Sequence, residues 1–163
     1  MNDLPPLPGP LPWPVRDSRA HYFVDHYSDM HALVADLVLP EHAPAYVVSA
    51  LETSRELIRH SYYRYEFTTV AVTHSLFALE RALAEHLGVK KNFQQLIALA
   101  AATDTITADL ADRLDAGRLL RNKLAHGELT GSALTPVMAV SMVRAAFDTA
   151  AVLFPAPVGT APA

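Results

Sequence analysis

The sequence at residues 119–127 is Leu-Leu-Arg-Asn-Lys-Leu-Ala-His-Gly, and it joins a helical pattern to a clear helix end. Gly127 accepts the left-handed backbone conformation that closes helices, so the stretch predicts a helix whose last turn contains His126. In that turn the helix dipole and the unpaired carbonyls favour the charged imidazolium form of histidine. Asn122, one turn earlier, is expected to lie close enough to orient the ring.

Arg121 points in a different direction from His126. At about 100° per residue the two side chains are about 140° apart around the helix, whereas Arg121 is only about 20° from Leu110. Arg121 therefore shares the apolar face, where a guanidinium needs an anionic partner. Glu80, in an earlier helix, is the candidate partner, and the alternative is an ordinary exposed glutamate. A site that uses both Arg121 and His126 requires a bend at the helix end or a second copy of the chain.

The remaining sequence predicts an all-α bundle of about five helices with short connections, and no strand pattern competes with it. The apolar arc of the longest predicted helix is wide enough for burial on two sides, so one side could be a self-association surface. In the last helix, Arg144 and Asp148 are expected to pair on a polar edge, which argues against a membrane span. The predicted helices cover residues 21–39, as a weaker added helix, and then 44–60, 61–87, 92–97, 105–126 and 136–154.

Three regions are expected along the chain. Residues 1–20 contain alternating prolines, which predict an extended polyproline arm with Trp13 as one docked aromatic residue. Residues 21–154 form the helical bundle domain, and residues 155–163 a disordered tail. The 163-residue chain, 51% apolar, fits one domain with a real core.

The pattern Arg-Asn-x-x-x-His at 121–126 resembles the signature of the HEPN superfamily, small helical proteins many of which are RNA-cutting toxins or defence proteins. The resemblance covers about residues 43–154. The segment 62–67 leads into residues 76–83, which look like the long second helix of that fold, and residues 92–97 look like its short intermediate helix. The resemblance implies a homodimer whose motif helices face each other, and in some members an antitoxin partner.

The same resemblance implies a metal-independent endoribonuclease. RNA supplies its own nucleophile, the 2′-hydroxyl, so cleavage needs a proton acceptor and donor and a cation on the phosphate. His126 suits the first role and Arg121 the second, while Asn122 would fix the ring tautomer or bind a phosphate oxygen. The expected products carry a 2′,3′-cyclic phosphate and a 5′-hydroxyl. Lys123 and Arg118 are the candidate substrate-binding residues, and no cofactor or metal is implied.

Charge and composition limit these functions. The formal net charge of −4 is not that of a protein that coats nucleic acid, so RNA contact must be local. A small basic patch on the motif helix would provide it, and the alternative is a solvated helix face. Without cysteine or a secretory signal, the chain is expected to be cytoplasmic, with no membrane partner. The candidate patch contains Arg113, Arg118, Arg121 and Lys123, with Lys90 and Lys91 added if the fold brings them close.

Other sites and functions are less well supported. His21, His26 and His31 recur at five-residue steps that turn each side chain off the previous face, which disfavours a metal site. Two other classes of function remain open. The first is a HEPN-like dimerisation or binding module without catalysis, and the second is an unrelated bundle that binds an apolar ligand between helices.

Overall fold

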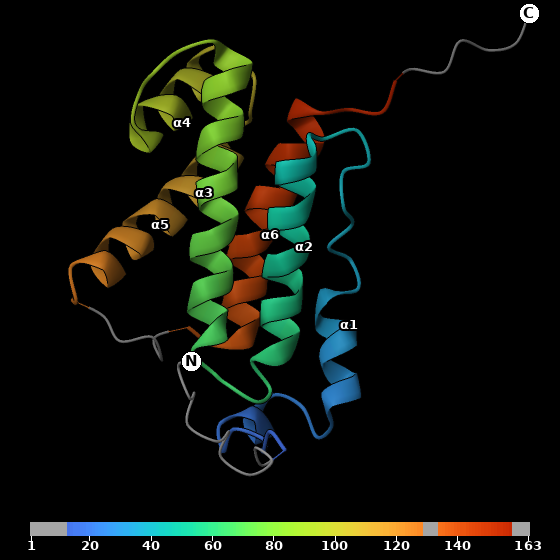
Figure 1. The fold of residues 1–163 in the computed structure, drawn as a ribbon. Helices are drawn as coiled ribbons and strands as arrows, with labels where there is room; N and C mark the ends of the chain where they lie inside the picture. Colours follow the sequence, from blue (N-terminus) through green and yellow to red (C-terminus); the bar gives the residue numbers. More distant parts are fainter. Residues whose placement is uncertain (1–12, 129–133, 158–163) are drawn as a thin grey trace, which may run out of the picture.

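The computed structural model describes residues 13–128 and 134–157, and this part of the chain contains six α helices and no strand. The predicted all-α fold is therefore confirmed. Helices α2, α3 and α6 stand side by side, with α1 beside α2, α4 near the end of α3, and α5 leaning away from α3 (Figure 1). The elements are η1 Ala20–Tyr22, η2 Tyr27–Asp29, α1 Met30–Val34, α2 Ala45–His60, α3 Phe67–Leu87, α4 Phe93–Ala102, α5 Ala108–Ala125 and α6 Pro136–Leu153.

Local capping signals set most of the helix ends where the sequence predicts them. The Asn92 side chain accepts a hydrogen bond from the backbone of Gln95, and the Gln95 side chain accepts one from Asn92 in return, so α4 starts at a capping box. The Thr107 and Thr135 hydroxyls each accept a hydrogen bond from the backbone N–H three residues further on and so cap α5 and α6. Helix α6 starts at Pro136 as predicted, whereas α5 starts at Ala108, three residues after the predicted start. The short intermediate helix predicted at 92–97 continues to Ala102.

Two helix predictions are wrong: a local contact explains the first, and a contact far apart in sequence explains the second. The predicted helix over 21–39 is three short pieces, because Asp29 accepts a hydrogen bond from the His26 backbone and starts a new turn there. The long helix starts at Phe67, not at 61. The chain turns at 61–66, where the backbone N–H of Tyr65 donates to the side chain of Asp17.

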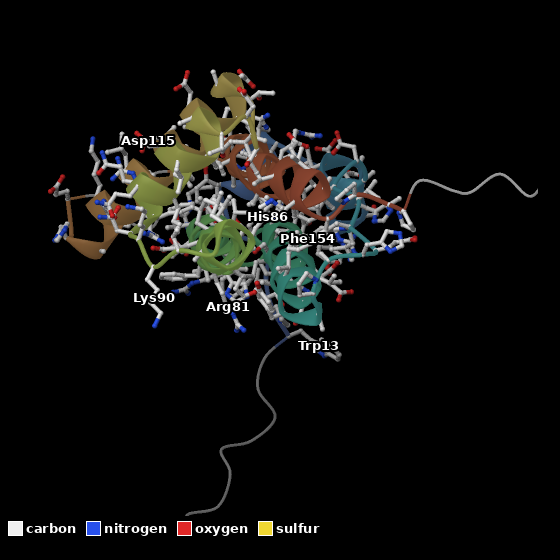
Figure 2. All side chains as sticks on the ribbon, turned by 90° about the horizontal axis from the view of Figure 1, so that it is seen from above. Trp13, Arg81, His86, Lys90, Asp115 and Phe154 are labelled. Carbon is white, nitrogen blue, oxygen red and sulfur yellow. The ribbon has the colours of Figure 1, made fainter. Side chains whose placement is uncertain are left out.

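Asp17 also fixes the segment that precedes the bundle. Its backbone N–H donates to the carbonyl of Tyr62, and its carboxylate receives two bonds from the Arg19 guanidinium, at 2.8 and 2.6 Å. Arg19 in turn pairs with Glu66 at 2.8 Å. Trp13, expected to be the docked residue, is 92% exposed and extends from the molecule (Figure 2). The ionic contacts of Asp17, and not Trp13, attach this segment to the turn at 61–66. Residues 1–12 of the predicted arm lie outside the described residues.

The core lies between α2, α3 and α6, and α6 supplies much of it. Among the described helices, α6 alone is long and apolar enough to cross a membrane, and 56% of it is buried inside the bundle. The expected pairing of Arg144 with Asp148 is wrong. Arg144 pairs with Asp36, after α1, at 2.7 Å, and Asp148 pairs with Arg113 of α5 at 3.1 Å, so both charges connect α6 to its neighbours.

The contacts of Asp17 predict an acid-sensitive attachment. The neighbouring Arg19 guanidinium holds the pKa of the Asp17 carboxyl well below its usual range. A lowered folded-state pKa means that the ionised group stabilises the fold above its unfolded pKa of about 3.9, and that this contribution is lost as the pH falls further. We expect Asp17→Asn to lower the Tm at neutral pH, and the difference from wild type to shrink below about pH 4.

Thermal denaturation followed by circular dichroism across this pH range measures the effect. Asp112→Asn, at an exposed position on α5, is the control and should leave the Tm unchanged. A Tm difference for Asp17→Asn that stays constant from neutral to acid pH would contradict the ionic attachment.

Candidate functional site

The end of α5 has the closure that Gly127 predicts. Gly127 has a φ of 72°, its N–H donates to the carbonyl of Leu124, and the N–H of Glu128 donates to the carbonyl of Lys123 at 2.9 Å. These two bonds form a Schellman motif, which satisfies the last carbonyls of the helix. His126 is the C-cap residue, and its side chain is exposed. The helix therefore runs straight to its end and presents His126 to solvent.

Arg121 lies on the opposite, inner side of α5, as the helical spacing predicts. Its side chain is only 15% exposed, and its Nη1 donates to Oε2 of Glu80, on α3, at 2.8 Å. The guanidinium carbon lies 5.1 Å from the ring centre of Phe77 and 5.3 Å from that of Phe93. The expected anionic partner is thus Glu80, and two aromatic rings from α3 and α4 hold the same guanidinium in place.

A glycine one turn earlier permits this contact between α5 and α3. Gly117 is buried, and a Cβ atom at that position would lie 3.2 Å from Cδ1 of Leu76. That distance is tighter than most side-chain contacts, so a larger residue would force the Leu76 side chain to shift. Gly117 therefore allows the close approach that brings Arg121 within hydrogen-bond distance of Glu80.

A polar pocket of about 250 Å³ opens beside Arg121. It lies where the N-terminal end of α4 faces α5 and α3. One hydrogen bond occupies one of the five guanidinium N–H groups of Arg121, and the residue still forms part of the pocket wall. An anionic group of a ligand would therefore meet guanidinium and amide donors here. The pocket is lined by Glu80, Asn92, Phe93, Gln94, Arg118, Arg121 and Asn122.

Three of the predicted site residues follow one stripe along α5. Arg118, Asn122 and His126 are spaced by four residues, so they fall within about 80° of arc over about 12 Å of helix. Arg118 and Asn122 line the pocket, whereas His126 lies beyond it, at the helix end. Within the described residues the Asn122 side chain makes no hydrogen bond to the imidazole of His126. The Asn122 backbone carbonyl accepts a hydrogen bond from the backbone N–H of His126 at 3.0 Å. One chain brings Arg118, Arg121, Asn122 and Glu80 together, and leaves His126 and the exposed Lys123 outside.

Carboxylates neutralise most of the expected basic patch. Arg118 Nε lies 2.6 Å from the Asp115 carboxylate, Arg113 pairs with Asp148, and Arg121 pairs with Glu80. Three of the four cations of the patch that lie on α5 are therefore in ion pairs. Lys90 is exposed and extends from the molecule (Figure 2), two residues before the pocket residue Asn92. Any RNA contact at this face is therefore local, as the net charge already requires.

The sequence reasoning missed the α4 wall of the pocket. Asn92 and Gln94 line it, and Phe93 contacts the Arg121 guanidinium. The capping pattern Asn-x-x-Gln at 92–95 marks a helix N-terminus, but the packing of that N-terminus against α5 is a long-range contact that no local pattern encodes. In the described part of the chain no group of three or more His, Asp or Glu side chains is placed to hold a metal ion.

The ion pair between Arg121 and Glu80 predicts a loss of stability when Glu80 alone is removed. Glu80→Ala leaves a mostly buried guanidinium without its carboxylate, which we expect to cost about 1–2 kcal/mol. For a domain of this size the Tm should fall by roughly 2–8 °C. Glu52→Ala, at an exposed glutamate of α2, is the matched control. Equal Tm values for the two variants would show that the pair contributes nothing to the fold.

No protein-family model matches this chain, and no curated protein or solved structure is significantly similar to it. The resemblance of residues 121–127 to the HEPN signature therefore stays a prediction from the sequence.

Proposed function

We propose that this protein is a metal-independent endoribonuclease of HEPN type, a toxin or defence effector that cuts RNA in the cytoplasm. One observation carries the proposal: Glu80, Phe77 and Phe93 hold Arg121 at the wall of a polar pocket, on the same helix end that presents His126. A mostly buried guanidinium fixed on three sides is pre-oriented for a phosphate. An exposed histidine further along the same helix end, His126, provides a side chain that can accept and donate a proton.

The proposed reaction needs only groups of the RNA and the protein. A base, His126, takes the proton of the 2′-hydroxyl, and the 2′-oxygen attacks the adjacent phosphorus. The bond from phosphorus to the 5′-oxygen breaks, and that oxygen takes up the proton held by the imidazolium of His126, which returns the histidine to its neutral form. The products are a 2′,3′-cyclic phosphate and a 5′-hydroxyl. Arg121 stabilises the negative charge that builds on the phosphate oxygens, and Asn122 and Arg118 hold the strand in the pocket.

Two copies of the chain would form the complete site. The straight end of α5 keeps Arg121 and His126 on different sides of the helix, so a second copy supplies the convergence that one chain lacks. The outer face of α3 offers a surface for this. Val70 and Phe77 are 48% and 57% exposed and line an apolar hollow of about 230 Å³, and Phe77 contacts Arg121. A symmetric dimer through this face would place the second copy beside the pocket.

The direct test is cleavage of a labelled, structured RNA by purified protein in excess chelator, with the product ends identified. Wild type should leave cyclic phosphate ends. His126→Ala should lower the rate by about 10²–10⁴-fold, because a proton-transfer group is lost. Arg121→Ala should lower it by about 10²–10³-fold, because transition-state charge is less stabilised.

The chain contains matched controls for both substitutions. His86 is an exposed histidine two residues before Gly88, which ends α3 in the same left-handed conformation. Arg81 is exposed, pairs with Glu85 at 2.8 Å, and its guanidinium carbon lies 4.0 Å from the ring centre of Tyr46. His86→Ala and Arg81→Ala should cut RNA like wild type. Undiminished cleavage by the His126 and Arg121 variants would eliminate the proposed site.

A substitution at Val70 tests the dimer. Val70 is two helical turns from Phe77, so its replacement leaves the contacts of Arg121 intact. In a symmetric interface Val70→Glu introduces two like charges, which cost several kcal/mol, so the variant should be monomeric and inactive. Light scattering after size exclusion measures the mass, and the RNA assay measures the activity. Val137→Glu, at a similarly exposed valine of α6, is the control. A monomeric variant that still cuts RNA would show that one chain contains the whole site.

A non-catalytic binding module is the second candidate, and the ion pairs favour it. Arg113, Arg118 and Arg121 all have carboxylate partners, which weakens attraction for RNA. Under this function the dimer would act as the binding partner of an antitoxin-like protein. Growth arrest on expression that His126→Ala relieves supports the nuclease. Absence of cleavage over a broad RNA panel, with the dimer intact, supports the module.

A further inference from the structure

A second pocket lies between α1 and α2. Helix α1 is on the side of the bundle away from α4 and α5 (Figure 1). The volume of the pocket is about 190 Å³. Helix α1 and its C-cap residue contribute His31 with the small apolar side chains of Val34 and Ala35, and α2 contributes two arginines and one glutamate. The lining thus contains two permanent positive charges against one negative charge, and an exposed histidine. It is lined by His31, Val34, Ala35, Arg55, Glu56 and Arg59.

Arg55 is a cation without a carboxylate. Eight of the ten arginines pair with an Asp or Glu within 4.0 Å; among the described residues only Arg16 and Arg55 do not. Arg55 is half-buried, and its one hydrogen bond there is a long one, 3.3 Å, from Nη1 to the carbonyl of Leu37. Most of its N–H groups, and its full charge, therefore remain available to a ligand in the pocket.

Arg59 lies one turn further along α2 and also has an unused donor. Its Nη1 donates to both carboxylate oxygens of Glu56, at 3.1 and 2.8 Å. Its Nε is buried without a hydrogen-bond partner, and no other buried side-chain nitrogen or oxygen in the described residues is left so. A buried unsatisfied donor is costly, so a ligand oxygen or an ordered water at this position would be stabilising.

An aromatic cluster adjoins Arg59. The guanidinium carbon of Arg59 lies 5.5 Å from the ring centre of Tyr27. The Tyr27 ring in turn lies 5.1 Å from Tyr63, 5.7 Å from His60 and 5.8 Å from Tyr62. His60 is exposed, and the three tyrosines are partly exposed. Arg59 thus lines the pocket and also contacts this aromatic cluster, whose rings are tilted or edge-on to one another.

We propose that this surface binds a nucleoside phosphate. The phosphate oxygens accept hydrogen bonds from Arg55 and from the N–H groups of Arg59 that Glu56 does not use, with His31 as a further donor, and the base packs on the rings around Tyr27. Guanidinium groups match the geometry of phosphate oxygens, and base stacking on aromatic side chains is a common source of nucleotide affinity. This site does not depend on the proposed nuclease, because neither Arg121 nor His126 lies in it.

The first test follows the arginine Nε–H signals by NMR while ligand is added. AMP should shift the Arg55 and Arg59 signals and leave Arg113, on α5, unchanged. Inorganic phosphate should do the same at higher concentration, because it lacks the base, and adenosine should bind more weakly than AMP. No shift at Arg59 with AMP at about 10 mM would overturn the site, since that limit excludes even millimolar affinity. Equal affinity for AMP and phosphate would overturn the nucleotide assignment.

A second arm identifies the source of the nucleotide. A 5′-phosphorylated trinucleotide that binds more tightly than AMP indicates the end of an RNA strand. Tighter binding of AMP indicates a free nucleotide. Either result supports the phosphate site, and the failure of the nuclease assay would leave both results unaffected.

Substitutions test the charge argument in both directions. Arg55→Ala should weaken AMP binding by about tenfold or more, through loss of charge-assisted hydrogen bonds. Because Arg55 also bonds Leu37, this change could loosen α1, so Glu56→Gln provides an independent variant. It removes the negative charge of the pocket and should tighten AMP binding by about twofold to fivefold. Weaker binding by Glu56→Gln would contradict the proposal, and Arg113→Ala should bind AMP like wild type.

Discussion

The ion pair between Arg121 and Glu80 is the constraint that determines the geometry of α5. A guanidinium that is 15% exposed on the inner face of a helix is stable only with a partner, and α3 supplies the carboxylate at 2.8 Å. The pair fixes the second half of α5 against α3, and the Phe93 contact fixes the start of α4 to the same point. The position of the polar pocket, its α4 wall and the outward direction of His126 all follow from that attachment.

The helix boundaries that the sequence predicts best are those set by local chemistry. Gly127 ends α5, and the backbone N–H groups of Gly127 and Glu128 donate to carbonyls of the same helix end. Thr135 and the proline that follows it start α6 where expected. The start of α3 was misplaced by six residues because Asp17, almost fifty positions away, binds the turn at 61–66. Local patterns predict the ends that local bonds determine, and they cannot predict ends that a distant side chain determines.

The same distinction applies to the candidate site. Arg121 was identifiable because a charge on an apolar face is a local anomaly, and that anomaly also indicated an acidic partner. The helical period alone gave the separation of Arg121 and His126, and the straight end of α5 agrees with it. The contribution of Asn92, Phe93 and Gln94 was not identifiable, because it depends on how α4 packs against α5. Predicting it requires the tertiary fold.

The pairing of Arg121 with Glu80 also bears on how the proposed nuclease would use a chain of net charge −4. The guanidinium of Arg121 and the carboxylate of Glu80 together have no net charge, so the pair adds little to the binding of RNA in its ground state. Its remaining N–H groups are nevertheless fixed in direction, and they interact more strongly as negative charge develops on the phosphate during the reaction. Interactions that strengthen only in the transition state raise the rate without raising the affinity. An acidic protein with neutralised arginines is therefore compatible with RNA cleavage, provided that the substrate is positioned by shape and local donors rather than by bulk charge.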